Sequence, residues 1–383
     1  MTVTSPQGFR ATGVAAGLKS SGGLDVALVV NDGPCTSAAG VFTRNRVRAA
    51  PVLWCEQVLA TGQLRAVVLN SGGANACTGP DGFADTHHTA EHVAGELDMG
   101  AIDVAVASTG LIGVRLPMPE LLSGITAAVK ELSTDGGPRA AEAIMTTDSV
   151  PKQASLTRDG FTVGGMAKGA GMLAPGLATM LVVLTTDADA APEALESALR
   201  AATAVTFDRV DSDGAMSTND TVLLLASGAS GQIPDQEALT AAVTEICHDL
   251  AQQLLSDAEG STKDISISVE QAASVDDAVA VARAIARNNL VKCAFFGADP
   301  NWGRILAAVG TTDATFEPDC LDVVINGVEV CRKGGIGEDR NTCDLTGREV
   351  DVQVRLHAGG HDATIWTNDL SLAYVHENSA YSS

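Results

Sequence analysis

The stretch Lys168–Leu184, KGAGMLAPGLATMLVVL, decides the fold. A glycine-rich loop leads into a Pro-Gly turn, and an unbroken run of apolar strand formers begins at Thr179. Such a run lacks the alternation of a strand with one solvated face, so it predicts a strand that is buried on both sides. A strand of this kind needs other elements packed above and below it.

Further apolar runs predict strands along most of the chain, and helical periodicity predicts helices between them. The predicted strands cover residues 25–30, 65–70, 103–108, 180–184, 222–226, 264–269, 322–330, 350–355 and 363–367. The predicted helices cover residues 119–132, 192–204, 236–258 and 275–288. We therefore expect a mixed α/β fold. From about Thr311 onward the pattern of short strands and turns indicates a smaller β-rich unit.

Composition limits the classes of partner. Lys and Arg number 24 against 47 Asp and Glu, so the formal net charge is −23. A surface this acidic repels nucleic-acid backbones and anionic lipid surfaces, and neither is an expected partner. No apolar run approaches the roughly 18 residues of a membrane span, and the first residues lack the pattern of a secretory leader. We expect a cytoplasmic protein, with its eight cysteines reduced.

Three short patterns resemble known sites but lack an essential part. His88-Thr-Ala-Glu-His92 has the H-x-x-E-H spacing of a zinc site, and a solvated helix face is the simpler interpretation. In Gly164–Gly171, GGMAKGAG, the lysine precedes Gly169, whereas a phosphate-binding loop needs its lysine directly after a glycine. Asp211-Ser-Asp-Gly214 lacks the closing glutamate of a calcium loop. No metal or nucleotide cofactor is therefore expected.

A series of motifs runs through the chain in a fixed order. They are GVFT (40–43), NSGGANACTG (70–79), STGLIG (108–113), IMTTD (144–148), KGAGMLAPGLATML (168–181), STNDT (217–221), EGSTK (259–263), DPNWGR (299–304) and ENSAYSS (377–383). Together they make the chain resemble the ornithine acetyltransferase (glutamate N-acetyltransferase) family over nearly its whole length. The resemblance implies a layered α/β/β/α sandwich with a nucleophilic threonine.

The resemblance also implies that the chain cuts itself between Ala178 and Thr179. The products would be an α chain of residues 1–178 and a β chain of residues 179–383, which has 383 − 178 = 205 residues. Residues 179–310 would complete the catalytic core, and residues 311–383 would form the smaller unit. Cleavage has a chemical purpose, since the new α-amine of Thr179 is a base next to a weakly nucleophilic hydroxyl.

Other site residues follow from the same resemblance. Thr109 and Gly110 match the pair that stabilises the oxyanion of the tetrahedral intermediate. The substrate contacts correspond to Thr146, Lys168, Thr179, Glu259, Asn378 and Ser383. Lys168 would pair with a substrate carboxylate, and Glu259 would hold or deprotonate an amino group. Asn378 and Ser383 would bring the end of the chain over the site.

The expected reaction is transfer of acetyl from N2-acetyl-L-ornithine to L-glutamate through an acetyl ester on Thr179, in cyclic arginine biosynthesis. The two fragments would stay together as an α2β2 assembly. Three alternatives remain open at this point: a bifunctional enzyme that also uses acetyl-CoA, a self-cleaving aminopeptidase or amidase that uses water as acceptor, and a non-catalytic binder of small molecules.

Overall fold

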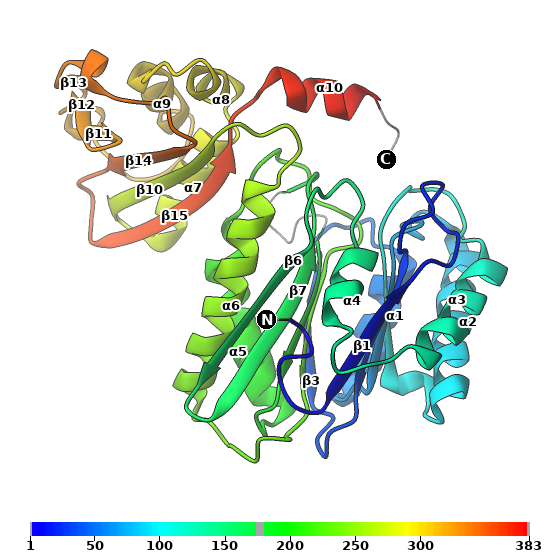
Figure 1. The fold of residues 1–383 in the computed structure, drawn as a ribbon. Helices are drawn as coiled ribbons and strands as arrows, with labels where there is room; N and C mark the ends of the chain where they lie inside the picture. The colour runs from blue at the N-terminus through cyan, green and yellow to red at the C-terminus, as the bar shows by residue number, and fades with distance from the viewer. Residues whose placement is uncertain (1, 174–179, 381–383) are drawn as a thin grey trace.

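The computed structural model describes residues 2–173 and 180–380 (Figure 1). Within them the first sheet has the order β1-β2-β4-β5. Its strands are β1 (Phe9–Val14), β2 (Val26–Asn31), β4 (Ala66–Asn70) and β5 (Val104–Ser108). The β4–β5 pair is parallel and the other pairs are antiparallel.

The second sheet has the order β3-β9-β8-β7-β6. Its strands are β3 (Ala38–Phe42), β6 (Lys152–Arg158), β7 (Phe161–Lys168), β8 (Leu181–Thr186) and β9 (Thr221–Ala226). Strand β8 lies at the centre, parallel to β9 and antiparallel to β7. It corresponds to the strand predicted from the apolar run that follows Thr179.

Burial on both faces of β8 is confirmed. Leu181 and Val183 belong to the hydrophobic core that the two sheets share. Val182 and Leu184 point the other way, into the core between this sheet and its helices. Because side chains alternate along a strand, a strand between two apolar layers must be apolar at every position.

Helices cover the outer face of each sheet and complete four layers (Figure 1). The first sheet is covered by α1 (Ala50–Val58), α2 (Gly79–Leu97) and α3 (Met118–Lys130). The second is covered by α5 (Pro192–Val205) and α6 (Gln236–Ser256), while the short α4 (Gly137–Ala143) packs beside β1 and β2. The expected mixed α/β sandwich is confirmed.

A third, six-stranded sheet forms a separate C-terminal lobe, drawn in yellow-green to red in Figure 1. Its strands are β10 (Asp264–Ala272), β11 (Asp322–Ile325), β12 (Val328–Arg332), β13 (Gly335–Ile336), β14 (Glu349–Arg355) and β15 (His361–Asn368). Helix α7 (Val275–Ala286) packs on it, and α8 (Asn289–Phe296) and α9 (Trp302–Val309) contribute to the same core.

Two expectations about this lobe need correction. Strand β10 pairs with both β14 and β15, so the sheet takes in chain from residue 264 rather than from about 311. The run 322–330, expected as one strand, is a hairpin of β11 and β12. Asn326 and Gly327 have φ values of 46° and 81°, the left-handed conformation that a tight hairpin turn requires.

Helix α10 (Leu372–Ala380) leaves the C-terminal lobe and runs across toward the core, as the red helix in Figure 1 shows. No residue of this helix is buried. Its start is anchored because the Ser371 hydroxyl accepts a hydrogen bond from Tyr374 N at 3.0 Å. Gly260 lies against the same turn, where a Cβ would be only 2.1 Å from Tyr374 N. The helix therefore reaches over the core from one fixed point.

Candidate active site

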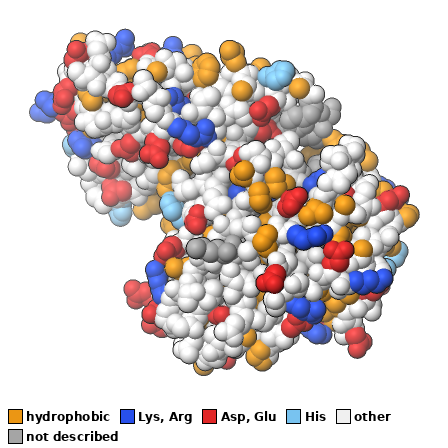
Figure 2. Space-filling view, in the orientation of Figure 1, with side chains coloured by type: hydrophobic (Ala, Val, Ile, Leu, Met, Phe, Trp, Pro, Cys, Tyr) orange, Lys and Arg blue, Asp and Glu red, His pale blue; other side chains and the backbone are white. Residues whose placement is uncertain are grey.

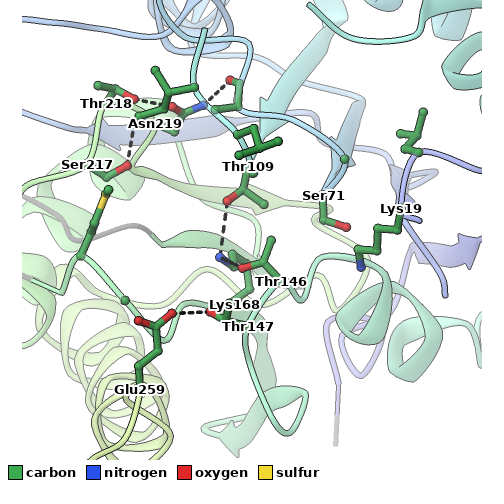
Figure 3. A pocket seen from close by; sticks show the side chains of 18 of the residues that line it. Lys19, Ser71, Thr109, Thr146, Thr147, Lys168, Ser217, Thr218, Asn219 and Glu259 are labelled. Atoms are coloured by element: carbon green, nitrogen blue, oxygen red, sulfur yellow. Dashed lines mark hydrogen bonds between the residues drawn. The ribbon is translucent and has the colours of Figure 1, made fainter. Parts of the chain in front are cut away.

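A cavity of about 390 Å³ opens where several strands of the two central sheets meet (Figure 3). Strands β4, β5 and β7 end beside it, and β9 begins beside it. The structure places six of the expected site residues in its wall: Thr109, Gly110, Thr146, Lys168, Glu259 and Asn378. Ala178, Thr179 and Ser383 lie outside the described residues.

Thr109 and Gly110 form a turn that is held by backbone hydrogen bonds. Thr109 N donates to Asn70 O at 3.0 Å, and Thr109 O accepts from Gly73 N at 3.0 Å. Gly110 has a φ of 130°, and a Cβ there would lie 2.8 Å from Gly73 N. Only glycine fits this turn, because a side chain would meet both backbone strain and a steric clash.

Asn219 fastens this turn to two other loops. Its Nδ2 donates to Ser108 O at 2.8 Å and to Ala74 O at 2.6 Å. Its Oδ1 accepts from the Thr218 hydroxyl at 2.7 Å, and the residue is 4% exposed. One buried amide thus joins the loops that follow β4 and β5 to the loop that precedes β9.

Lys168 projects from the end of β7 and is 2% exposed. Its Nζ donates to Thr146 Oγ1 at 2.7 Å and to Thr109 Oγ1 at 3.4 Å (Figure 3). It lies 3.8 Å from Asp148 Oδ2. Burial lowers the pKa of the Lys168 ammonium, and the charge of Asp148 opposes that effect. Since Thr109 accepts this hydrogen bond, its own hydroxyl proton points elsewhere.

Asp148 is the buried anion that organises this wall. Its Oδ2 accepts from Thr146 N at 2.9 Å, and its Oδ1 accepts from Gly169 N at 2.7 Å and from Lys152 Nζ at 2.6 Å. Burial by itself raises the pKa of Asp148, but the ammonium groups of Lys168 and Lys152 outweigh it and bring the pKa to about 2. The carboxylate therefore stays ionised and positions both Thr146 and Lys168.

Glu259 enters from the opposite side of the cavity to Thr109 (Figure 3). Its Oε1 accepts from the Thr147 hydroxyl at 2.7 Å, and its backbone N donates to Ala170 O at 2.9 Å. Gly171 packs directly on the carboxylate, where a Cβ would lie 2.7 Å from Glu259 Oε2. The glycine at 171 thus makes room for the acid.

The chain on either side of the segment 174–179 is fixed. Gly171 and Met172 line the cavity wall. Met180 N, on the other side, donates to Asp220 Oδ1 at 3.1 Å. Asp220 is fully buried next to Asn219, and burial raises its pKa well above the usual value. The residue after the expected nucleophile is therefore anchored beside the cavity wall.

The H-x-x-E-H pattern lies on the surface of α2. His92 Nε2 is 2.9 Å from Thr126 Oγ1 on α3, and His87 pairs with Glu91 at 3.7 Å. Within residues 2–173 and 180–380, no group of three or more His, Cys, Asp or Glu side chains is arranged to hold a metal ion. In the same ranges, none of the helices has the length and apolar character to cross a membrane.

Sequence reasoning assigned no role to several residues that shape the cavity: Lys19, Ser71, Asp148, Asn219 and Asp220. The last three belong to the motifs IMTTD and STNDT, which carry the family resemblance without assigning these residues a role. Lys19 stands in GLKSSGG (17–23), a polar glycine-rich loop that gives no sign of its partners. The cavity residues that it joins, such as Ser71 and Lys168, come from distant parts of the chain, so local patterns could not identify its place in the site.

Comparisons with known proteins identify the family of this chain. The ArgJ family profile matches residues 10–383. Two curated relatives, from Streptomyces coelicolor and Streptomyces avermitilis, are both called arginine biosynthesis bifunctional protein ArgJ. They are 66% and 67% identical over 383 residues and cover 100% of both chains. A solved ornithine acetyltransferase from Mycobacterium tuberculosis, complexed with ornithine, is 64% identical over 47% of this chain and 96% of its own, with a TM-score of 0.45.

The profile matches almost the whole chain, and full-length relatives are two-thirds identical to it. Together these findings establish the family. This chain belongs to the ArgJ family of arginine-biosynthesis enzymes.

Proposed function

We propose that this chain moves an acetyl group from N2-acetyl-L-ornithine to L-glutamate through an acetyl ester on Thr179. Membership of the ArgJ family makes it an acyltransferase of arginine biosynthesis. The observation that carries the detailed proposal is the meeting of Thr109, Lys168 and Glu259 in one cavity. Acyl transfer between amino acids needs a hydrogen-bond donor to the oxyanion, a cation for the substrate carboxylate and a carboxylate for the amine.

The first half-reaction starts after cleavage between Ala178 and Thr179. The freed α-amine of Thr179 takes the hydroxyl proton, and the hydroxyl oxygen attacks the acetyl carbonyl carbon. The tetrahedral oxyanion would receive hydrogen bonds from the Thr109 hydroxyl and from Gly110 N–H, each typically worth about 3–4 kcal/mol. The amide C–N bond then breaks, the leaving amine takes up the proton, and ornithine departs.

The second half-reaction reverses these steps with glutamate. Its amino group attacks the acetyl ester. Glu259, which lines the cavity, would hold that amine or accept a proton from it. Lys168 would bind the α-carboxylate, because its ammonium lies beside Thr109 in the cavity wall. The charge of Asp148, 3.8 Å away, favours the charged form of that ammonium. Thr146, Asn378 and Ser383 would complete the amino-acid contacts. No cofactor takes part in either step.

The cleaved chains would remain together, because β7 of the α chain and β8 of the β chain are paired along their length. We include in the proposal an α2β2 assembly in the cytoplasm, with residues 1–178 and 179–383 as its two kinds of chain.

Intact-mass spectrometry tests this proposal. Purified protein should give two chains that divide between Ala178 and Thr179, and acetylornithine should add one acetyl group to the β chain. Glutamate should then remove that group as N-acetylglutamate. The Thr179→Ala variant should remain one chain without transferase activity. A single intact chain in active wild-type protein would refute the mechanism.

The same assay separates the alternatives. Acetate release without glutamate would indicate the hydrolase, and absence of any acetyl adduct would indicate the binder. The curated relatives are named bifunctional, which favours a second donor as the next candidate to test. Acetyl-CoA supplied in place of acetylornithine should acetylate Thr179 only if the enzyme uses both donors.

A further inference from the structure

We propose that Lys19 selects the acceptor by binding its side-chain carboxylate. This inference rests on the proposed function, because it takes the two amino-acid substrates as given. It adds a contact to the cavity and explains how one pocket favours an acidic side chain in one half-reaction and releases a basic one in the other.

The loop that carries Lys19 is built around one buried carboxylate. Asp25 is 0% exposed. Its two oxygens accept hydrogen bonds from four successive backbone N–H groups, those of Ala16 (2.6 Å), Gly17 (3.1 Å), Leu18 (2.6 Å) and Lys19 (3.1 Å). A loop held in this way presents its side chains in a fixed direction.

A second contact fixes the same loop against the cavity wall. A Cβ at Gly72 would lie 2.2 Å from Leu18 Cβ, so glycine at 72 allows the loop to pack on the segment that follows β4. Leu18, Lys19 and Gly72 all line the cavity. The ammonium of Lys19 is consequently part of the cavity wall and not a mobile surface charge.

The Lys19 ammonium has donors to offer a ligand. It is half-buried, and within the described part of the chain its Nζ donates to one acceptor, Leu24 O, at 2.7 Å. An ammonium has three N–H donors, so two can serve a bound anion. Burial lowers its pKa, the charges of Asp25 and Asp148 oppose this effect, and the nearby Lys168 charge adds to it. A carboxylate bound there would raise the pKa of the Lys19 ammonium again.

Three charged side chains of the described wall follow one another across the cavity. Figure 3 shows Glu259 on one side and Lys19 on the other, with Lys168 between them. Glutamate carries an amine, an α-carboxylate and a side-chain carboxylate. With its amine toward Glu259 and its α-carboxylate on Lys168, its side chain extends to Lys19.

Ornithine fits the same arrangement less well than glutamate does, both before and after its α-nitrogen loses the acetyl group. Its side chain ends in an ammonium, which would meet the ammonium of Lys19. Like charges at close range repel, and the partly buried position limits screening by salt. Lys19 would thus favour exchange of ornithine for glutamate after the first half-reaction.

The test compares glutamate with glutamine, its neutral isostere, as acceptor for preformed acetyl-enzyme. The variants are Lys19→Met, Lys19→Arg and, as a matched control, Lys130→Met on the exposed end of α3. Wild type should prefer glutamate strongly. Lys19→Met should reduce that preference, measured as the ratio of kcat/KM values, by about tenfold or more. Lys19→Arg should retain most of it, and the control should match wild type.

Two further readouts complete the test. Lys19→Met should show a lower KM for acetylornithine and stronger inhibition by ornithine, because both carry the side-chain ammonium that Lys19 would repel. An unchanged glutamate-to-glutamine ratio would overturn the proposal, as would equal losses in both half-reactions. Failure of wild type to form acetyl-enzyme would instead refute the proposed function, so the two failures are distinguishable.

Discussion

Replacement of Asn219 by alanine should loosen the oxyanion turn and destabilise the core. The amide donates to two buried carbonyl oxygens, Ser108 O at 2.8 Å and Ala74 O at 2.6 Å. Removal of a donor leaves each carbonyl unsatisfied at a cost of about 1–3 kcal/mol. Two such groups give a total of about 2–6 kcal/mol.

Thermal unfolding measures this loss. For a core of this size, 1 kcal/mol corresponds to roughly 2–4 °C in Tm. Even the lower bound of about 2 kcal/mol then predicts a decrease in Tm of at least about 4 °C. The neighbouring Thr218→Val variant is the control, because it removes only one hydrogen bond, the one to Asn219 Oδ1. Its Tm should fall by less than half as much.

Activity provides the second readout for Asn219→Ala. Ser108 precedes Thr109, so a displaced turn should slow formation of acetyl-enzyme well beyond any effect of lower stability at the assay temperature. The reasoning fails if Asn219→Ala unfolds within about 1 °C of wild type, or if it forms acetyl-enzyme at the wild-type rate. Either result alone would show that the amide does not hold these loops together.

Three other variants probe the remaining parts of the site. Gly171→Ala should lower kcat/KM by about tenfold or more with little change in Tm, because its Cβ displaces the Glu259 carboxylate; wild-type kinetics would contradict this. Asp148 has a folded pKa of about 2, below its ordinary value of 3.8, so its ionisation stabilises the fold by about 2 kcal/mol at neutral pH, and this is lost as pH falls from about 4 to about 2. The Tm difference between wild type and Asp148→Asn should therefore be largest near pH 7 and shrink below pH 4; a constant difference would exclude this linkage. Asn378→Ala should raise KM for both amino acids and leave Tm unchanged, since α10 buries no residue, and an unchanged KM would remove Asn378 from the site.

The continuous apolar strands could be predicted from sequence to within one or two residues. Strands β4, β5, β8 and β9 are buried at every position, so hydrophobicity alone identifies them. Strand β7 was not predicted, because two glycines interrupt its pattern. Those glycines are strand residues at close approaches: a Cβ at Gly164 would lie 2.4 Å from Thr2 O, and one at Gly165 would lie 2.7 Å from a Leu184 methyl. Only the packed structure reveals that these two positions have no room for a side chain.

The candidate site, like the fold, could be predicted from sequence only in part. Thr109, Lys168 and Glu259 were named because motifs mark them, and the structure brings them into one cavity, where their roles remain proposals. Lys19 could not be found from sequence, since its relation to Lys168 depends on how the loop around Asp25 meets β7. Chemical roles that arise from long-range geometry leave no local pattern.

The pairing of β7 with β8 determines how the mature enzyme would respond to dilution. Cleavage before Thr179 would place these adjacent strands on different polypeptides, although Val163–Lys168 and Leu181–Thr186 stay aligned residue by residue. Denaturation of the processed form would then be a dissociation, with a midpoint that rises with protein concentration. The uncut Thr179→Ala precursor keeps both strands on one chain, so the separation of its two halves should not depend on concentration. One cut in the backbone would thus change the molecularity of folding without altering a single contact between the two strands.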